Sequence, residues 1–395
     1  MLESIINLTI MAAIFLAAII SAKFNTTVAI IEILFGILLS NPFSITATDW
    51  MQYLASLGGI VLTFLAGAEV DLPLLRAKFK ESFLIGFLSF MLPFISVILF
   101  CYYALGWGLS GALIGGCALS TTSLAVVYSV LVETGLTNTE IGKLLMCATF
   151  ITDIGTAVAL SVLFLEFSLF TVIFFAISII VIVVGTKSKK IFNHPALENR
   201  VTQPQIKYLL LLIFILMFFA ELGDSHAILP VFVLGVFIAP LLNSKGKTGT
   251  DLQKTFRSIA YVMITPFFFI VGGLRVSLPL LFGAFWLFLI LFGIKMLTKF
   301  VATYHLTKRY CNGHHVFFTL LMSTGLTFGT ISSLYGLEMG YIDQVQFSVL
   351  IAVVIFSAII PTVIAQKFFF PKDQCATTEI VKETGKTKSN DPIPS

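Results

Sequence analysis

The sequence predicts an all-α polytopic membrane protein, and two observations carry the prediction. The 395 residues are 58% hydrophobic and only 11% charged, whereas a soluble domain carries about twice that charged fraction. Apolar segments close to 20 residues long also follow one another along the chain, and about this length lets a helix cross a bilayer. Helices are expected in them because a helix satisfies its own backbone hydrogen bonds, and the short alternating strands of a membrane barrel are absent.

Thirteen transmembrane spans are expected. They lie near residues 4–22, 27–43, 52–71, 81–105, 109–133, 139–165, 168–186, 206–222, 226–242, 256–274, 278–303, 314–336 and 343–368. Residues 1–22 lack a basic start and a small-residue cleavage site, so we interpret them as the first span rather than a removable signal. We expect one transmembrane domain over residues 1–370 and a short, polar, disordered cytoplasmic tail over residues 371–395.

The basic residues predict the orientation. With the N-terminus outside, the inside loops hold nearly all the loop lysines and arginines, and the outside loops hold only Arg275. This asymmetry follows the positive-inside rule and places the C-terminus in the cytoplasm. Because these residues are spread over loops, the net charge of +4 does not indicate a nucleic-acid partner.

No enzyme is expected. The five cysteines are scattered and never in CxxC spacing, which argues against disulfides and a zinc site. GLSG at 108–111 and LGD at 222–224 resemble protease motifs, but no deep histidine and no second, suitably placed aspartate accompany them. A nucleotide-binding GxxxxGK[ST] loop is also missing.

Two spans are interrupted by small polar residues. The segments ALSTTSLAVV (118–127) and LLMSTGLTFG (320–329) lie seven spans apart, so the second copy is inverted relative to the first. The interrupting residues are Thr121, Thr122 and Ser123 in one span and Ser323, Thr324 and Gly325 in the other. Paired interruptions of this kind indicate the central site of a transporter. Alternatively, these small residues only let helices pack closely.

A single carboxylate, Asp153, lies in FITDIGTAVAL near the middle of the span at 139–165. An ionised aspartate at this depth costs several kcal/mol unless it faces water, a cation or a basic partner. Burial disfavours its charged form, so the group holds either a proton or a metal cation. The alternative is a structural aspartate that is hydrogen-bonded within the bundle. Hard monovalent cations prefer oxygen ligands, so Thr152 and carbonyls freed around residues 121–123 are candidate partners.

Four more charged residues need an interpretation. Lys295, in LILFGIKMLTKF, needs a partner, which is either Asp153, whose charge it would tune, or the dipoles of the interrupted helices. Alternatively, it reaches the cytoplasmic face, helped by Lys299. Glu69 and Asp71 either form a cytoplasmic funnel for cations or pair with Arg76 or Lys78. Glu32 is interpreted as a residue at the boundary of the second span.

Several segments together resemble the cation:proton antiporter superfamily, most closely the branch with bacterial sodium/proton and potassium/proton exchangers. They are FLAGAEVDLPLLR, CALSTTSLAVVYSVLVETG, ATFITDIGTAVALSVL, LPVFVLGVFIAPLL, ITPFFFIVGGLRVSL and FGIKMLTK, in the family's order over residues 27–368. The resemblance implies the sodium/proton antiporter fold, with thirteen helices and two broken helices that cross near the midplane. It also implies a homodimer, with dimerisation and core bundles interleaved in one domain.

The resemblance makes Asp153 the residue that binds the cation and the proton, and Lys295 its charge-tuning partner. Thr152 departs from the family, which commonly has Asp or Asn there, so only one carboxylate is present. One proton per cation follows if Lys295 keeps its proton, and electrogenic exchange follows if it does not. The sequence leaves both open.

The expected function is secondary antiport of Na⁺, K⁺ or Li⁺ against H⁺ by alternating access, in a bacterial-type plasma membrane and without a cofactor. The expected partners are cations, protons, the lipid bilayer and a second copy of the chain. A sodium-coupled organic anion carrier of the same fold, a membrane sensor or receptor, and a cation channel are the alternatives.

Overall fold

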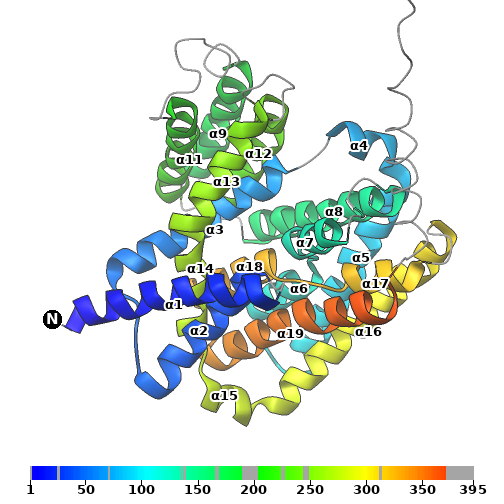
Figure 1. The fold of residues 1–395 in the computed structure, drawn as a ribbon. Helices are drawn as coiled ribbons and strands as arrows, with labels where there is room; N and C mark the ends of the chain where they lie inside the picture. Colours follow the sequence, from blue (N-terminus) through cyan, green and yellow to red (C-terminus); the bar gives the residue numbers. More distant parts are fainter. Residues whose placement is uncertain are drawn as a thin grey trace, which may run out of the picture.

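The computed structural model describes residues 2–24, 27–69, 72–134, 136, 139–164, 169–188, 203–223, 227–242, 249–310 and 314–370. Within these ranges every regular element is a helix, which confirms the all-α prediction (Figure 1). Eleven helices there are long and apolar enough to cross a membrane, and two shorter apolar helices correspond to the other two predicted spans. The predicted tail over residues 371–395 lies outside the described residues.

One set of helices forms what we call the first bundle. Its members are α1 (Leu2–Phe24), α2 (Val28–Phe43), α3 (Asp49–Ala68), α9 (Leu169–Lys187), α11 (Pro204–Leu222), α12 (Ile228–Leu242), α13 (Gly249–Ile259), the π-helix η3 (Ala260–Ile264) and α14 (Thr265–Leu274). Within it, α3 packs against α12 and α14, α14 packs against α2, and α9 packs against α11 and α12. In Figure 1, α9, α11, α12 and α13 gather at the upper left.

The remaining long helices form the second bundle. Its members are α5 (Phe79–Leu99), the π-helix η1 (Phe100–Ala104), α6 (Leu109–Ser120), α7 (Leu124–Glu133), α8 (Glu140–Leu163), α16 (Phe285–Tyr310), α17 (His315–Met322), α18 (Thr327–Glu338) and α19 (Gln344–Phe368). The order of long helix, broken pair and long helix occurs twice, as α5 to α8 and as α16 to α19. Between the bundles, α8 contacts α12 and α18 contacts α3.

Two short helices lie outside these sets, and one corrects a predicted span. α4 (Leu72–Ala77) follows α3 in the chain, and α15 (Leu278–Gly283) precedes α16. We predicted one span over residues 278–303, but α15 ends at Gly283 and the spanning helix runs from Phe285 to Tyr310. The apolar sequence continues across the junction, and so hydropathy alone did not reveal the break.

Glycines bring the backbones of the first bundle into direct contact. A Cβ atom at Gly67 on α3 would clash with a carbonyl oxygen of α12, and one at Gly235 on α12 would clash with a carbonyl oxygen of α3. Gly36 on α2 and Gly273 on α14 are related in the same way. Such close approach is how helices associate in a bilayer, where the hydrophobic effect does not drive their packing. The glycines therefore fix the spacing of α3 to α12 and of α2 to α14.

Replacing Gly67 with Ala is expected to destabilise the protein by about 1–3 kcal/mol, because the new methyl group would force α3 and α12 apart. Thermal unfolding of the purified protein in detergent measures this as a lower Tm. Gly293→Ala is the matched control, because nothing lies within 4 Å of a Cβ there on α16 and alanine favours a helix. Equal Tm values for the two variants would contradict the tight α3–α12 contact.

Candidate functional site

Both helices predicted to be interrupted are broken, and the two breaks touch. Residues 121–123 separate α6 from α7, and residues 323–326 separate α17 from α18. The Thr122 hydroxyl donates a hydrogen bond of 2.8 Å to the carbonyl oxygen of Met322, the last residue of α17. On the other side of the crossing, a Cβ at Gly325 would lie 3.2 Å from the carbonyl oxygen of Thr121. The two breaks thus cross in the interior of the second bundle.

α8 brings Asp153 and Thr152 to the first break. Asp153 is only 2% exposed, and the Thr121 hydroxyl donates to its Oδ1 at 3.3 Å. The backbone N–H of Thr122 donates to Thr152 Oγ1 at 3.1 Å, while Thr152 Oγ1 donates to the carbonyl oxygen of Thr149 at 2.6 Å. An ionised carboxylate accepts about four hydrogen bonds, so Asp153 keeps most of its acceptor capacity for a proton or a cation.

Ser123 is placed differently from the other four residues of the predicted ion-binding set. Its hydroxyl accepts a 3.4 Å hydrogen bond from the N–H of Val126 and its carbonyl accepts one of 3.0 Å from Val127. Both oxygens therefore accept hydrogen bonds from backbone N–H groups in the first turn of α7. In the second break, the Ser323 and Thr324 hydroxyls bond back to carbonyls of α17, and Ser357 on α19 donates to the carbonyl of Gly325 at 3.4 Å.

Two lysines on α16 are fully buried, one turn apart. Lys299 Nζ donates to Thr122 Oγ1 at 2.9 Å and to Ser89 Oγ on α5 at 3.0 Å. Lys295 lies against Gly325, and its Nζ has no hydrogen-bond partner among the described residues. The idea that Lys295 reaches the cytoplasmic face with the help of Lys299 is wrong, because both side chains are 0% exposed.

Sequence reasoning missed the part that Lys299 plays at the crossing. Its spacing of four residues from Lys295 was the available signal, because residues four apart share a helix face. A buried ammonium group needs several acceptors, and the Thr122 and Ser89 hydroxyls supply two of them.

Glu69, at the end of α3, forms an ion pair with Arg257 on α13. The expected alternative, pairing with Arg76 or Lys78, is wrong for this residue, and Lys78 instead pairs with Glu140 at 2.8 Å. The Arg257 guanidinium also lies 5.4 Å from the centre of the Tyr128 ring on α7, so it joins the two bundles. Asp71 lies outside the described residues.

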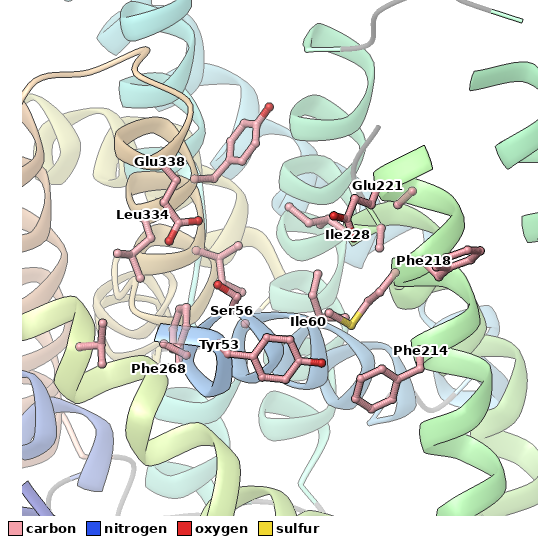
Figure 2. Close-up of a pocket in the computed structure, with 18 of the residues that line it drawn as sticks. Tyr53, Ser56, Ile60, Phe214, Phe218, Glu221, Ile228, Phe268, Leu334 and Glu338 are labelled. Atoms are coloured by element: carbon pink, nitrogen blue, oxygen red, sulfur yellow. The ribbon is translucent and has the colours of Figure 1, made fainter. Parts of the chain in front are cut away.

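Two cavities lie between the bundles, at opposite ends of α18. The Glu69 cavity, about 450 Å³, is lined by Glu69, Tyr128, Arg257, Tyr261 and Thr327, among others. The Glu338 cavity, about 480 Å³, is walled by α3, α11, α14 and the far end of α18. Figure 2 shows Tyr53 and Ser56 of α3, Phe214 and Phe218 of α11, and Glu338 of α18 around the second cavity. Asp153 lines neither cavity.

Three buried aromatic rings close the contact between the bundles beside Asp153. Phe232 on α12 stacks on Phe150 on α8 at 5.7 Å and meets Phe328 on α18 edge-on at 6.0 Å. Phe150 lies three residues before Asp153 and so on the same face of α8. Phe328 lies between Thr327, which lines the Glu69 cavity, and Ile331, which lines the Glu338 cavity. Phe328 thus belongs to the part of α18 between the residues that line the two cavities.

Comparison with known proteins gives a consistent result. The sequence profile of the family described as "Sodium/hydrogen exchanger, transmembrane" matches residues 10–370. The chain is 27% identical to "Probable Na(+)/H(+) antiporter 3" of Methanocaldococcus jannaschii, over 92% of this chain and 96% of that protein. It is 24% identical to "Na(+)/H(+)-K(+) antiporter GerN" of Bacillus cereus, over 83% and 85% of the two chains.

A solved structure supports the fold. The sodium proton antiporter MjNhaP1 from Methanocaldococcus jannaschii, determined at pH 8, superimposes with a TM-score of 0.67 over 92% of this chain and 95% of that chain, at 16% identity. The similarity confirms the predicted antiporter fold, and the profile match confirms the superfamily resemblance.

Replacing Thr122 with Val is expected to lower the Tm, because the Met322 carbonyl loses its side-chain donor and the Lys299 ammonium loses one acceptor. Each buried polar group that loses its partner costs about 1–3 kcal/mol. Thr122→Ser keeps the hydroxyl and is the control, expected to stay near the wild-type Tm. If Val and Ser substitutions shift the Tm equally, the hydroxyl does not hold the crossing together.

Proposed function

Because the chain belongs to the sodium/hydrogen exchanger family, we propose that it is a secondary active antiporter that exchanges Na⁺ or K⁺ for H⁺ by alternating access. Members of this family are transporters rather than enzymes and need no cofactor. The observation that carries the proposal is Asp153, a buried carboxylate at the crossing of two broken helices that accepts a hydrogen bond from Thr121. The names of the relatives support Na⁺ as a substrate, and the name of GerN supports K⁺ as a second one.

In this proposal Asp153 alternates between a proton and a cation. Its carboxylate, the Thr121 and Thr152 hydroxyls and nearby carbonyl oxygens form an all-oxygen shell, which suits a hard monovalent cation. A bound proton and a bound cation each neutralise the carboxylate, so each excludes the other. Lys299, held by Thr122 and Ser89 at the same crossing, would stabilise the deprotonated carboxylate whenever its ammonium group is charged.

The two cavities provide access from the two sides of the membrane. The second bundle, with Asp153, would move against the first so that the three-ring contact opens toward one cavity at a time. With the N-terminus outside, as the basic loops favour, the Glu69 cavity faces the cytoplasm and Glu69 belongs to the cation funnel. We place the protein in the plasma membrane as a homodimer joined through the first bundle, whose α1 and α9 expose many large apolar side chains.

Asp153→Asn is expected to abolish exchange, because an amide neither gains nor releases a proton between pH 6 and 9. Everted vesicles from an antiporter-deficient host, with a fluorescent ΔpH probe, report exchange as dequenching when Na⁺, K⁺ or Li⁺ is added. Glu140→Gln is the control, because that carboxylate is exposed at the start of α8. Dequenching by Asp153→Asn at the wild-type rate, with equal protein in the membrane, would overturn the proposed site.

The KM for the transported cation is expected to rise as the pH falls, because protons compete for Asp153. On the acid side the increase approaches about tenfold per pH unit for a single competing proton, with the maximal rate unchanged by competition alone. Initial dequenching rates over a range of cation concentrations, at several pH values, give both quantities. A KM that stays constant between pH 6 and 9 would mean that proton and cation do not share one carboxylate.

A further inference from the structure

One ion pair joins the two bundles directly. Arg275 caps the end of α14 in the first bundle, and its Nη1 lies 2.8 Å from Oε1 of Glu338, the last residue of α18 in the second bundle. The Gln344 side chain on α19 donates to the carbonyl oxygen of Arg275, so the second bundle binds this residue twice. Arg275 and Glu338 both line the Glu338 cavity, and Figure 2 shows Glu338 there beside Leu334.

Arg275 is fixed to the first bundle. Two residues before it, Gly273 touches the backbone of α2. Directly after it, the Asn41 side chain of α2 donates to the carbonyl oxygen of Val276 at 3.0 Å and accepts from the N–H of Leu278 at 2.7 Å. Because α2 holds the chain on both sides of Arg275, this residue must move with the first bundle.

Glu338 is fixed to the second bundle in a similar way. α18 packs closely against α6. A Cβ atom at Gly329 would lie 2.9 Å from the carbonyl oxygen of Ala118, and one at Gly336 would lie 2.6 Å from the side chain of Ile114. Glu338 follows Gly336 by two residues and must move with α6. The ion pair therefore connects two surfaces that the proposed motion would displace against each other.

The ion pair ends a row of contacts that we call the α14–α18 seam. A Cβ atom at Gly272 would lie 3.5 Å from Leu334 Cδ1 and 3.7 Å from Thr330 Cγ2. Thr330, Leu334 and Glu338 are spaced four residues apart and so share one face of α18. Apolar contacts thus form the first part of the seam, and the Arg275–Glu338 pair forms its end. Separating the bundles here would uncover Leu334 and break the ion pair.

The ion pair at the Glu69 cavity has a different arrangement. Glu69 and Arg257 both belong to the first bundle, and Arg257 reaches the second bundle through the Tyr128 ring at 5.4 Å. A separation of the bundles at that cavity would keep the Glu69–Arg257 pair. At the Glu338 cavity, by contrast, a separation would break the pair of Arg275 and Glu338.

We propose that the Arg275–Glu338 pair is a latch, which favours the closed state of the α14–α18 seam and separates when the second bundle moves. This inference rests on the bundle motion of the proposed function. The two side chains are 25% and 45% exposed, so both charges can be hydrated when they are apart. A pair with this much exposure shifts an equilibrium by up to about fivefold, which biases the motion without preventing it.

The test measures how often the seam opens. Leu334→Cys places a thiol that is covered while the seam is closed, because Leu334 is only 6% exposed. The protein is purified in detergent and labelled with an excess of a fluorescent maleimide, and protein without this substitution gives the background from the native cysteines. We expect Glu338→Gln to raise the labelling rate by up to about fivefold.

Two variants serve as controls for the loss of charge. Glu221→Gln is expected to leave the labelling rate unchanged, because Glu221 lines the same cavity but forms no ion pair with any residue in the described part of the chain. Arg275→Glu combined with Glu338→Arg restores a pair of opposite polarity and should return the rate to near its starting value. Equal rates for Glu338→Gln and Glu221→Gln would overturn the latch, as would a charge-swapped protein that labels as fast as Glu338→Gln.

A reversible crosslink gives a second measurement, should Leu334→Cys impair folding. Arg275→Cys with Glu338→Cys, joined by a short bifunctional thiol reagent that a reductant cleaves, should lose cation-driven dequenching in vesicles and regain it on reduction. Full exchange by the crosslinked protein would mean that the two residues stay together throughout the cycle, and the latch would be wrong. Absence of exchange by the unmodified protein would contradict the proposed function alone, because the labelling rates require no transport.

Discussion

The structure depends on how two interrupted helices satisfy their backbone groups where no water is available. Each break frees N–H and C=O groups that would cost several kcal/mol apiece in hydrocarbon. The Thr122 side chain and amide meet this need by bonding to Met322 and Thr152, so the two breaks and α8 hold one another in place. Lys299 extends the same network to α5 and α16. The network fixes the oxygen atoms around Asp153, and the surrounding helices of the second bundle seal it.

The helix contacts within the first bundle differ in stiffness from the contacts between the two bundles. Within the first bundle, glycines let backbones touch, and such contacts have little freedom to shift because atoms of fixed position interlock. Between the bundles, the contact beside Asp153 is made by the rings of Phe150, Phe232 and Phe328. Flat apolar rings lose no hydrogen bond when they slide. The rigid parts and the compliant surface therefore lie where the proposed motion of one bundle against the other would require them.

Much of this was readable from the sequence because the signals were local. Span length, the clusters at Thr121 and Ser323, and the isolated Asp153 are each visible within one segment. Features that depend on which helix faces meet were not readable. The partner of Glu69 is Arg257, 188 residues away, and Glu32 resembled a boundary residue until the α2–α14 contact showed that it is buried.

The two repeats have a further correspondence, and it has an evolutionary meaning. The Thr121 hydroxyl meets Asp153, 32 residues further along the chain, and the carbonyl of Gly325 meets Ser357, also 32 residues further along. Ser357 thus holds the place in the second copy that Asp153 holds in the first. Duplication supplied two equivalent backbones, yet at these two corresponding positions only the first copy has a titratable group. In the proposed exchange the cation therefore meets a single carboxylate from the first copy, whereas the second copy contributes the buried lysines Lys295 and Lys299.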